Sequence, residues 1–437
     1  MSPIEILMLS MLALFLLGIP IFMALAASSC ITLLCTDILP LSIIHNSLFD
    51  GLNIFPLLAV PSFVVAGTLM EYGNITNQII TVVKQIVGRS FGGLGICTIL
   101  ACTFFAAIAG SGTATTAAIG AILIPSMMKN SYKPEHAAAI TASGGTIGTL
   151  IPPSNSMIMF AVLGNVSVTG LFTAGFIPGF LVAFSLCLTT YIISKKNNYH
   201  GDENFKFDKK EFFTSCRKGF FSLFTPFIVL GSIYLGIATP VEASIIAVGY
   251  AIFIGVFINR CLTLTHIWKA LMSGVMVCGT VVIIVATSTL LGKILTLENA
   301  PFKLSEMIIS ISNNPIVVLL LIVGMLYILG MFMETLALII ILTPVLMPTT
   351  NALGIDPIQF GILMVLATNV GMLTPPLGVN LFVSSRIAKT TVEKVFIGVI
   401  PFLIALTVCV LLMIFFPSIS TCLPSLLGYN IESFEWL

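Results

Sequence analysis

The hexapeptide Gly148-Thr149-Leu150-Ile151-Pro152-Pro153 returns 223 residues later as Gly371-Met372-Leu373-Thr374-Pro375-Pro376. The same offset, from Gly148 to Gly371, carries Pro125 onto Pro348 without a gap. Each copy places a glycine and two prolines inside a long apolar stretch, where they loosen a helix and remove backbone donors. Matching interruptions in the two halves of a membrane protein are typical of the binding site of a transporter.

The composition places the chain in a membrane. Of its 437 residues, 58% are hydrophobic and only 8% are charged, against roughly 25% charged in soluble domains. The formal net charge of +1 gives no reason to expect a nucleic-acid partner. The N-terminus lacks a basic segment and a cleavage site, so it is expected to be a first helix rather than a signal peptide. The ten cysteines are scattered, without the spacing of a metal site.

The repeated pattern predicts an all-α polytopic membrane protein made of two inverted-topology repeats. Each repeat is expected to hold about five transmembrane helices and one re-entrant hairpin. The first repeat is predicted at 1–194, a cytoplasmic polar linker at 195–218 and the second repeat at 219–437. The hairpins are expected at 92–128 and 315–350, the broken helices at 136–160 and 358–382. In the second repeat, an arm near Arg260–Lys269 is expected to precede a separate crossing at 272–292.

The loop charges support the inversion independently. Lys129 and Lys133 follow the first hairpin, whereas the matching loop Asn351–Pro357 has neither Lys nor Arg. Conversely, Gly164–Gly170 is uncharged, and its partner near Arg386–Lys394 is basic. A basic side that alternates between matching loops is expected of inverted repeats. Both termini lack Lys and Arg, which predicts that they are periplasmic; Lys293 and Lys303 do not fit this pattern.

The two breaks are candidate cation sites. Prolines free the carbonyl groups of the preceding turn, and such oxygens around Gly144–Ile151 and Thr368–Thr374 can ligate Na⁺. The alternative is a proline kink that a neighbouring Ser or Thr closes by hydrogen bonding. Two breaks at one offset favour the site over the kink.

The hairpin tips are the second group of candidates. The first tip, Gly110–Thr113, is made of small residues and offers the Ser111 hydroxyl, although small residues also serve close helix packing. The second tip places Glu334 deep in the apolar zone. An intramembrane carboxylate is a functional hypothesis by default, with Na⁺ or backbone N–H groups as its partner. The alternative is a protonated Glu334 bonded to a neighbouring helix.

Four stretches resemble the large membrane subunit of the tripartite ATP-independent periplasmic (TRAP) transporters. They are GSGTATTAAIGAILIP at 110–125, GGTIGTLIPPSNSMIMFAVLGNVSVTGLFTAGFIPG at 144–179, GIATPVEAS at 236–244 and NVGMLTPPLGVNLFV at 369–383. The resemblance implies a sodium-coupled elevator-type importer in the bacterial inner membrane. It also implies a small four-helix membrane subunit, expected here as a separate polypeptide, and a periplasmic binding protein that delivers a carboxylate. The sialic-acid branch looks closest, with C4-dicarboxylates and other sugar acids as alternatives.

The resemblance also carries site residues over. It implies one Na⁺ site at Ser111, Thr113, Gly144, Gly148 and Ile151, and a second at Glu334, Thr335, Thr368, Gly371 and Thr374. Relatives often have Asp where this chain has Glu334. The expected substrate-binding residues are Ser111, Gly112, Ser154, Asn155 and Asn380. A stand-alone sodium-coupled carrier without a binding protein remains an alternative, whereas an enzyme would lack a nucleophile or metal set.

Overall fold

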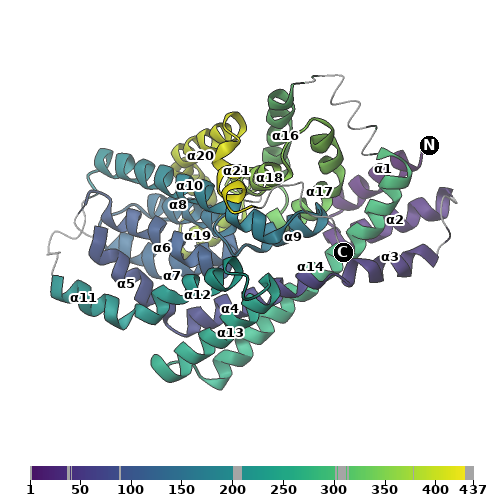
Figure 1. Ribbon diagram of the computed structural model, residues 1–437. Helices are drawn as coiled ribbons and strands as arrows, with labels where there is room; N and C mark the ends of the chain where they lie inside the picture. The colour runs from purple at the N-terminus through teal and green to yellow at the C-terminus, as the bar shows by residue number, and fades with distance from the viewer. Residues whose placement is uncertain are drawn as a thin grey trace.

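The computed structural model describes residues 2–36, 40, 42–87, 90–199, 209–300, 303, 312, 314–376 and 378–428, and in these ranges all regular structure is helical (Figure 1). Six helical segments there are long and apolar enough to cross a membrane. They are Phe55–Tyr72, Val168–Lys196, Pro240–Ile258, Leu264–Leu297, Thr335–Ala352 and Val392–Phe415. The predicted fold class, an all-α polytopic membrane protein, is thereby confirmed.

The helices of the first half begin and end at local signals in the sequence. Ser2 and Glu5 form a capping box at the start of the first helix, and the Ser167 hydroxyl caps the last. The elements are α1 Pro3–Leu16, α2 Ile21–Thr36, α3 Ser42–Leu52, η1 Phe55–Leu58, α4 Ala59–Tyr72, α5 Ile75–Val87, α6 Gly93–Ala109, α7 Gly112–Lys129, α8 Pro134–Gly145, η2 Thr146–Thr149, α9 Asn155–Leu163 and α10 Val168–Lys196.

The second half largely repeats these bounds. Shifted by 223 residues, α7 falls on α17, and the first residue of α8, Pro134, falls on Pro357, the first of α18. The elements are α11 Lys209–Lys218, α12 Phe220–Tyr234, α13 Pro240–Phe253, η3 Ile254–Ile258, α14 Leu264–Leu297, α16 Pro315–Gly330, α17 Thr335–Ala352, α18 Pro357–Gly371, α19 Val379–Ala388, α20 Val392–Phe415 and α21 Ser418–Leu426. The inverted orientation of the two halves and the division into domains stay predictions.

The linker is helical at both of its described ends. Helix α10 continues through Lys195 and Lys196, and α11 occupies 209–218. Residues 200–208, the middle of the predicted linker, lie outside the described residues.

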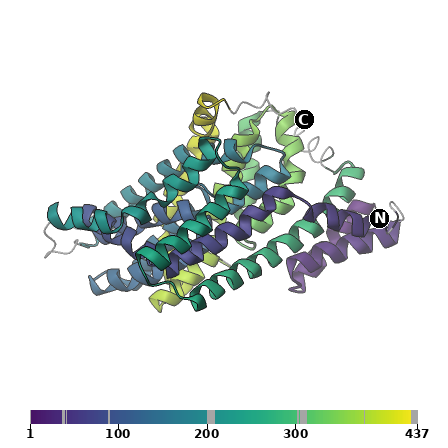
Figure 2. The same cartoon turned by 60° about the horizontal axis from the view of Figure 1, so that its bottom comes forward.

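The expected division between an arm and a crossing in the second half is wrong. A single helix, α14, runs from Leu264 to Leu297 and extends along much of the molecule (Figure 2). In the first half, α3 and α4 are separate helices, with Pro56 at the start of the 3₁₀ turn between them. The repeat offset carries Pro56 onto Gly279, and 264–297 contains no proline. The hydrogen-bond ladder therefore continues where the first half breaks it.

Lys293, which did not fit the charge pattern, has a partner in the structure. Its Nζ lies 2.9 Å from Oδ2 of Asp50, which joins α14 to α3. Gly51 lets the two helices approach, because an added Cβ would lie 2.5 Å from the Thr289 hydroxyl. Both charged side chains are partly exposed, so the pair contributes about 0–1 kcal/mol and chiefly fixes the register of α3 on α14.

The packing arranges the helices in two groups. Helix α14 packs along α2, α3 and α4, and α4 also packs against α13. In the other group α7 packs against α6 and α8, α16 against α18, and α17 against α9. The two halves meet at the buried rings of Phe160 in α9 and Phe360 in α18, edge to face with centroids 5.9 Å apart. This contact brings the two interrupted helices to the centre of the molecule.

Candidate functional site

The connection between α6 and α7 is shaped by Gly110 and Ser111. Gly110 has φ +61°, and Ser111 is extended, with φ −142°. An added Cβ on Gly110 would lie 2.7 Å from the carbonyl oxygen of Pro153, and the backbone N–H of Asn155 donates to the Gly110 carbonyl over 3.2 Å. Only glycine combines this conformation with so close an approach. The connection is therefore seated on the first Pro-Pro segment.

Hydroxyl groups satisfy part of the first break. After α8 and η2, the chain passes through the cis bond between Pro152 and Pro153 before α9 begins. The Thr149 hydroxyl donates to the Thr146 carbonyl over 3.1 Å, and Ser154 Oγ donates to the Thr149 carbonyl over 2.5 Å. Ser154 Oγ also accepts from the N–H of Met157 and so caps α9. Here the structure follows, in part, the alternative of a kink closed by Ser and Thr.

The second break is packed against the end of α16. Helix α18 ends at Gly371, and an added Cβ there would lie 2.7 Å from Cα of Gly330. At the first break, an added Cβ on Gly148 would lie 2.7 Å from the Ser111 carbonyl oxygen. In both halves the hairpin thus touches the backbone of the interrupted helix, and the glycines at the breaks permit that contact.

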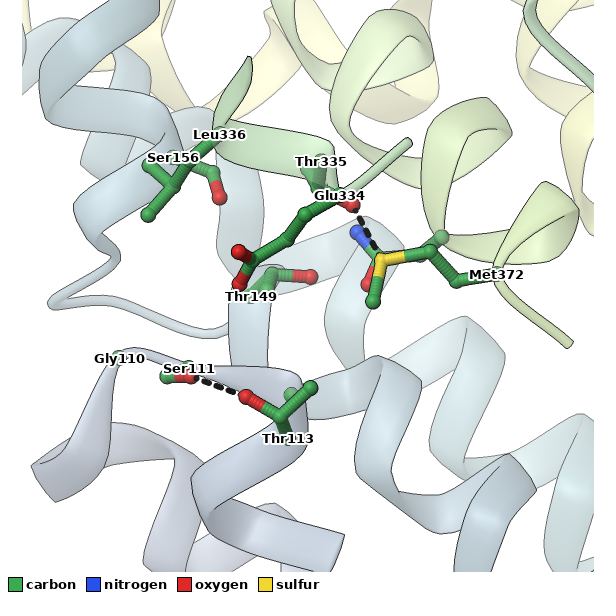
Figure 3. A pocket seen from close by; sticks show the side chains of 11 residues that line it. Gly110, Ser111, Thr113, Thr149, Ser156, Glu334, Thr335, Leu336 and Met372 are labelled. Atoms are coloured by element: carbon green, nitrogen blue, oxygen red, sulfur yellow. Dashed lines mark hydrogen bonds between the residues drawn. The ribbon is translucent and has the colours of Figure 1, made fainter. Parts of the chain in front are cut away.

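Both connections and both breaks line one small cavity of about 20 Å³ (Figure 3). Its lining residues are Gly110, Ser111, Gly112, Thr113, Thr149, Ser156, Glu334, Thr335, Leu336, Asn369 and Met372. The Ser111 and Thr113 hydroxyls are 3.2 Å apart, and the Thr335 hydroxyl donates to Met372 Sδ over 3.0 Å. A space of this size holds about one water molecule or one dehydrated ion.

Glu334 brings the charge to this cavity. It is the residue before α17, but its carboxylate makes no capping bond to the helix. Figure 3 shows the carboxylate extending toward Thr149 and the Gly110–Thr113 connection. Among the described residues, nothing donates a hydrogen bond to the Glu334 carboxylate or forms an ion pair with it, so its partner stays a prediction. A carboxylate at this depth calls for a positive partner.

Asn369 belongs to the same cavity, and the sequence reasoning missed it. Its Nδ2 donates to the Val365 carbonyl over 2.7 Å, but its buried Oδ1 has no hydrogen-bond partner within the described ranges. An added Cβ on Gly112 would lie 3.4 Å from this oxygen, which places it beside the first connection. A buried acceptor without a donor fits a bound cation. The sequence feature that could have identified Asn369 is its position, two residues before Gly371 inside an apolar stretch.

The predicted site residues are only partly brought together. Ser111, Gly112, Thr113, Glu334 and Thr335 line the small cavity. Gly144 faces Cys102 of α6, and the Ile151 side chain packs on Gly179. The Thr368 hydroxyl donates to the Met364 carbonyl, and Asn380 is fully buried away from the cavity. The predicted residues outside the lining are Gly144, Gly148, Ile151, Thr368, Gly371, Thr374, Ser154, Asn155 and Asn380.

A larger cavity of about 720 Å³ adjoins the small one. Ser111, Thr113 and Glu334 line both, so the two spaces share a wall. The larger cavity also receives Asn155, whose Oδ1 has no partner among the described residues, and is closed on its other side by α4 and α14. It is large enough for a small organic molecule, whereas the small cavity fits only an ion or a water.

Comparison with known proteins identifies the family. Residues 8–419 match the family described as tripartite ATP-independent periplasmic transporter, DctM component. The chain is 37% identical to the isethionate TRAP transporter permease protein DctMQ of Oleidesulfovibrio alaskensis, over 92% of this chain and 63% of that one. It is 36% identical to the sialic acid TRAP transporter large permease protein SiaM of Vibrio cholerae, over 94% of this chain and 96% of SiaM. Other relatives are named for C4-dicarboxylate or 2,3-diketo-L-gulonate transport.

A solved structure shares the fold. The Alcanivorax borkumensis YdaH transporter superposes with a TM-score of 0.62 over 89% of each chain, at 15% identity. The relatives above are named as transporter permeases rather than enzymes. The match over residues 8–419 and the identity to SiaM place this chain in the DctM family, the large permease component of the TRAP transporters.

Proposed function

We propose that this chain is the large membrane subunit of a bacterial inner-membrane importer that couples uptake of a small organic acid to a Na⁺ gradient. The observation that carries the proposal is the small cavity, where Ser111 and Thr113 from one half face Glu334 and Thr335 from the other. Four hydroxyl or carboxylate groups and the orphaned Asn369 oxygen form a set of hard oxygen donors. Such donors suit a hard cation rather than a soft one.

Binding of Na⁺ at the tips would prepare the larger cavity for an anion. A cation beside Glu334 would offset its negative charge, so an acid in the adjoining cavity could approach Ser111 and Asn155 without repulsion from Glu334. Ligation by groups from both hairpins would also hold the two connections in one arrangement. Na⁺ must bind one conformation better than the other, since otherwise the gradient could not drive the change.

The proposed movement is that of an elevator. The moving body consists of the hairpin helices and interrupted helices, α6–α9 and α16–α19, joined at their centre by Phe160 and Phe360. The static body contains α4 together with α13 and α14, each of which packs against α4. The larger cavity lies between these bodies, so displacement of one along the other would carry a cargo with it.

The relatives support a cargo class rather than a single compound. Their names state isethionate, sialic acid, C4-dicarboxylates and 2,3-diketo-L-gulonate, each of which carries a sulfonate or a carboxylate. We propose a small organic acid of this kind, with sialic acid tested first and the C4-dicarboxylates and other sugar acids next.

The proposed partners are a small membrane subunit and a periplasmic binding protein, and the termini of this chain are proposed to be periplasmic. The second candidate is a sodium-coupled carrier that works without a binding protein. The similarity of the fold to the YdaH transporter keeps that candidate in view, since the fold alone does not require a third component.

Uptake into proteoliposomes tests the proposal. The chain and its small subunit are reconstituted, and labelled sialic acid is offered with its binding protein under an inward Na⁺ gradient, with K⁺ replacing Na⁺ as the control. We expect uptake that needs both the gradient and the binding protein. Gradient-driven uptake without the binding protein would favour the second candidate. Failure with sialic acid, isethionate, succinate and 2,3-diketo-L-gulonate alike would contradict the proposed cargo class.

A further inference from the structure

The wall of the larger cavity formed by α4 and α14 carries polar side chains at intervals among apolar ones. On α14 the lining residues are Lys269, Ser273, Met276, Val277, Thr280 and Val281, whose spacing of three and four residues marks one face of the helix. On α4 the lining residues are Val64, Gly67, Thr68, Glu71 and Tyr72. From Lys269 to Thr280 this face extends about 16 Å.

One end of the cavity is fixed by an aromatic contact. Tyr72, at the end of α4, stacks on His266 in the first turn of α14, with ring centroids 4.9 Å apart. Lys269 follows one turn later and lines the cavity at this end, together with Glu71. The connection with Ser111 lies at the level of Gly67, because an added Cβ on Gly67 would be 3.2 Å from Cα of Ala109. Along α4, the Lys269 end of the cavity, at Glu71, thus lies about one helical turn from the level of the Ser111 connection, at Gly67.

Lys269 is available to a ligand. Its side chain is exposed to the cavity, and within the described ranges no carboxylate lies within ion-pairing distance of its Nζ, although Glu71 lines the same space. It is the one Lys or Arg among the residues that line the cavity there. Lys269 is the sixth residue of α14, so its exposed ammonium lies near one end of the helix.

The charges of the cavity show what this function can be. Glu71 and Glu334 contribute two negative groups and Lys269 one positive group. When Na⁺ offsets Glu334 at the tips, the Lys269 end offers the other attractive position for an anion. An acid that moves away from the hairpin tips can therefore leave the Na⁺ bound beside Glu334 and pair with the ammonium group of Lys269 instead.

We propose that Lys269 is a binding residue for the cargo's carboxylate or sulfonate group, where the acid stops on its way out. The basic residues Arg260 and Lys269 predict that this end of the cavity faces the cytoplasm. This inference rests on the proposed function for its cargo class. Ser273 and Thr68 line the cavity beside Lys269 and supply hydroxyl groups for the rest of the bound acid. The alternative is that Lys269 is a basic residue that determines the orientation of α14 in the membrane and does not bind cargo.

The test compares Lys269→Gln and Lys269→Arg with Lys293→Gln, a charge removal on the same helix outside the cavity. Counterflow is measured in proteoliposomes, with unlabelled sialic acid varied on the side that corresponds to the cytoplasm. We expect Lys269→Gln to raise the half-saturating concentration about tenfold, Lys269→Arg to retain most of the affinity and Lys293→Gln to match the parent. Equal half-saturation in the parent and Lys269→Gln would overturn the proposal.

A binding measurement separates this inference from the proposed function. The thermal stability of the purified chain is followed with sialic acid, isethionate or succinate, each as its sodium salt, against equal sodium chloride. We expect at least one acid to stabilise the parent and Lys293→Gln, but not Lys269→Gln. Such a result without any transport would support Lys269 while the proposed function fails. If no acid stabilises the parent, or if Lys269→Gln is stabilised equally, the proposal for Lys269 is wrong.

Discussion

At the scale of single residues, Glu334 carries the proposed coupling. Its carboxylate has no partner of its own within the described residues and extends into a cavity lined by both halves. Removal of the negative charge by Glu334→Gln or Glu334→Ala should weaken the apparent Na⁺ affinity about a hundredfold and abolish uptake at ordinary Na⁺. Ser111→Ala should abolish uptake as well. Uptake as a function of Na⁺ concentration measures both effects.

The control for this prediction is another glutamate at a helix start. Glu242 forms a capping box with Thr239 at the start of α13, so it stabilises a helix end instead of facing the cavity. Glu242→Gln keeps a side chain that can accept the capping bond, so it should change stability little and leave the Na⁺ dependence unchanged. Glu334→Asp keeps the charge and should retain part of the uptake. Full uptake by Glu334→Ala would remove Glu334 from the mechanism.

Asn369 allows a sharper test, because its two amide atoms do different things. Nδ2 donates to the Val365 carbonyl, whereas Oδ1 points without a partner at the cavity. Asn369→Leu removes both and should lower the apparent Na⁺ affinity about tenfold. Asn369→Asp keeps the acceptor and loses the donor, so it should keep the Na⁺ dependence. If the two variants behave alike in Na⁺ titrations of uptake, Asn369 acts through its contact with Val365.

The sequence predicts these residues unequally, for a physical reason. Glu334 is visible because a carboxylate in an apolar run is costly wherever the chain folds. Asn369 gains its role only when Gly112, 257 residues earlier in the sequence, is packed beside it. Ser154 follows the first break and was expected to bind substrate, but its hydroxyl is occupied within the break itself. Spacing in a sequence shows which groups are present, and long-range packing decides which are free.

At the scale of elements, the repeat offset predicts a helix well only where the local signals are repeated too. It places α7 on α17 because each follows a break at a hairpin tip, and it places α8 on α18 because each begins with proline. It fails for α14, where the proline of the first half is replaced by Gly279. The presence of Pro56 in the first half, and of Gly279 in its place in the second, thus accounts for two helices in one half and a single helix in the other.

That difference can be reversed by mutation. Gly279→Pro should break α14 at the position equivalent to Pro56 and cost about 3 kcal/mol, seen as a lower midpoint of thermal unfolding of the purified protein. Uptake should fall as well, because Lys269 and Thr280 would no longer share one continuous face. Gly279→Ala is the control. No atom lies within 4 Å of its added Cβ, so its stability should equal or exceed that of the parent. An unchanged midpoint in Gly279→Pro would show that α14 tolerates the kink.

At the scale of the whole molecule, the elevator proposal can be tested at the boundary of the two bodies. An added Cβ on Gly67 of α4 would lie 3.6 Å from Cβ of Ala109 at the end of α6, which is the distance that a disulfide requires. In the variant Gly67→Cys/Ala109→Cys, oxidation should stop uptake, and reduction should restore it. The two single-cysteine variants control for the ten native cysteines. Undiminished uptake by fully cross-linked protein would rule out displacement of α6 along α4.

The shared cavity also constrains the ancestry of the fold. Its wall needs Ser111 from one half and Glu334 from the other, and the rings of Phe160 and Phe360 hold the two halves at that point. A half-length ancestor could not have closed such a space alone. With the two repeats inverted as predicted, it would have needed a second copy of itself inserted in the opposite direction, so two-way insertion would have preceded the fusion of the genes. A single chain also lets the two copies differ, and here the equivalent positions hold a neutral serine, Ser111, and an acidic glutamate, Glu334.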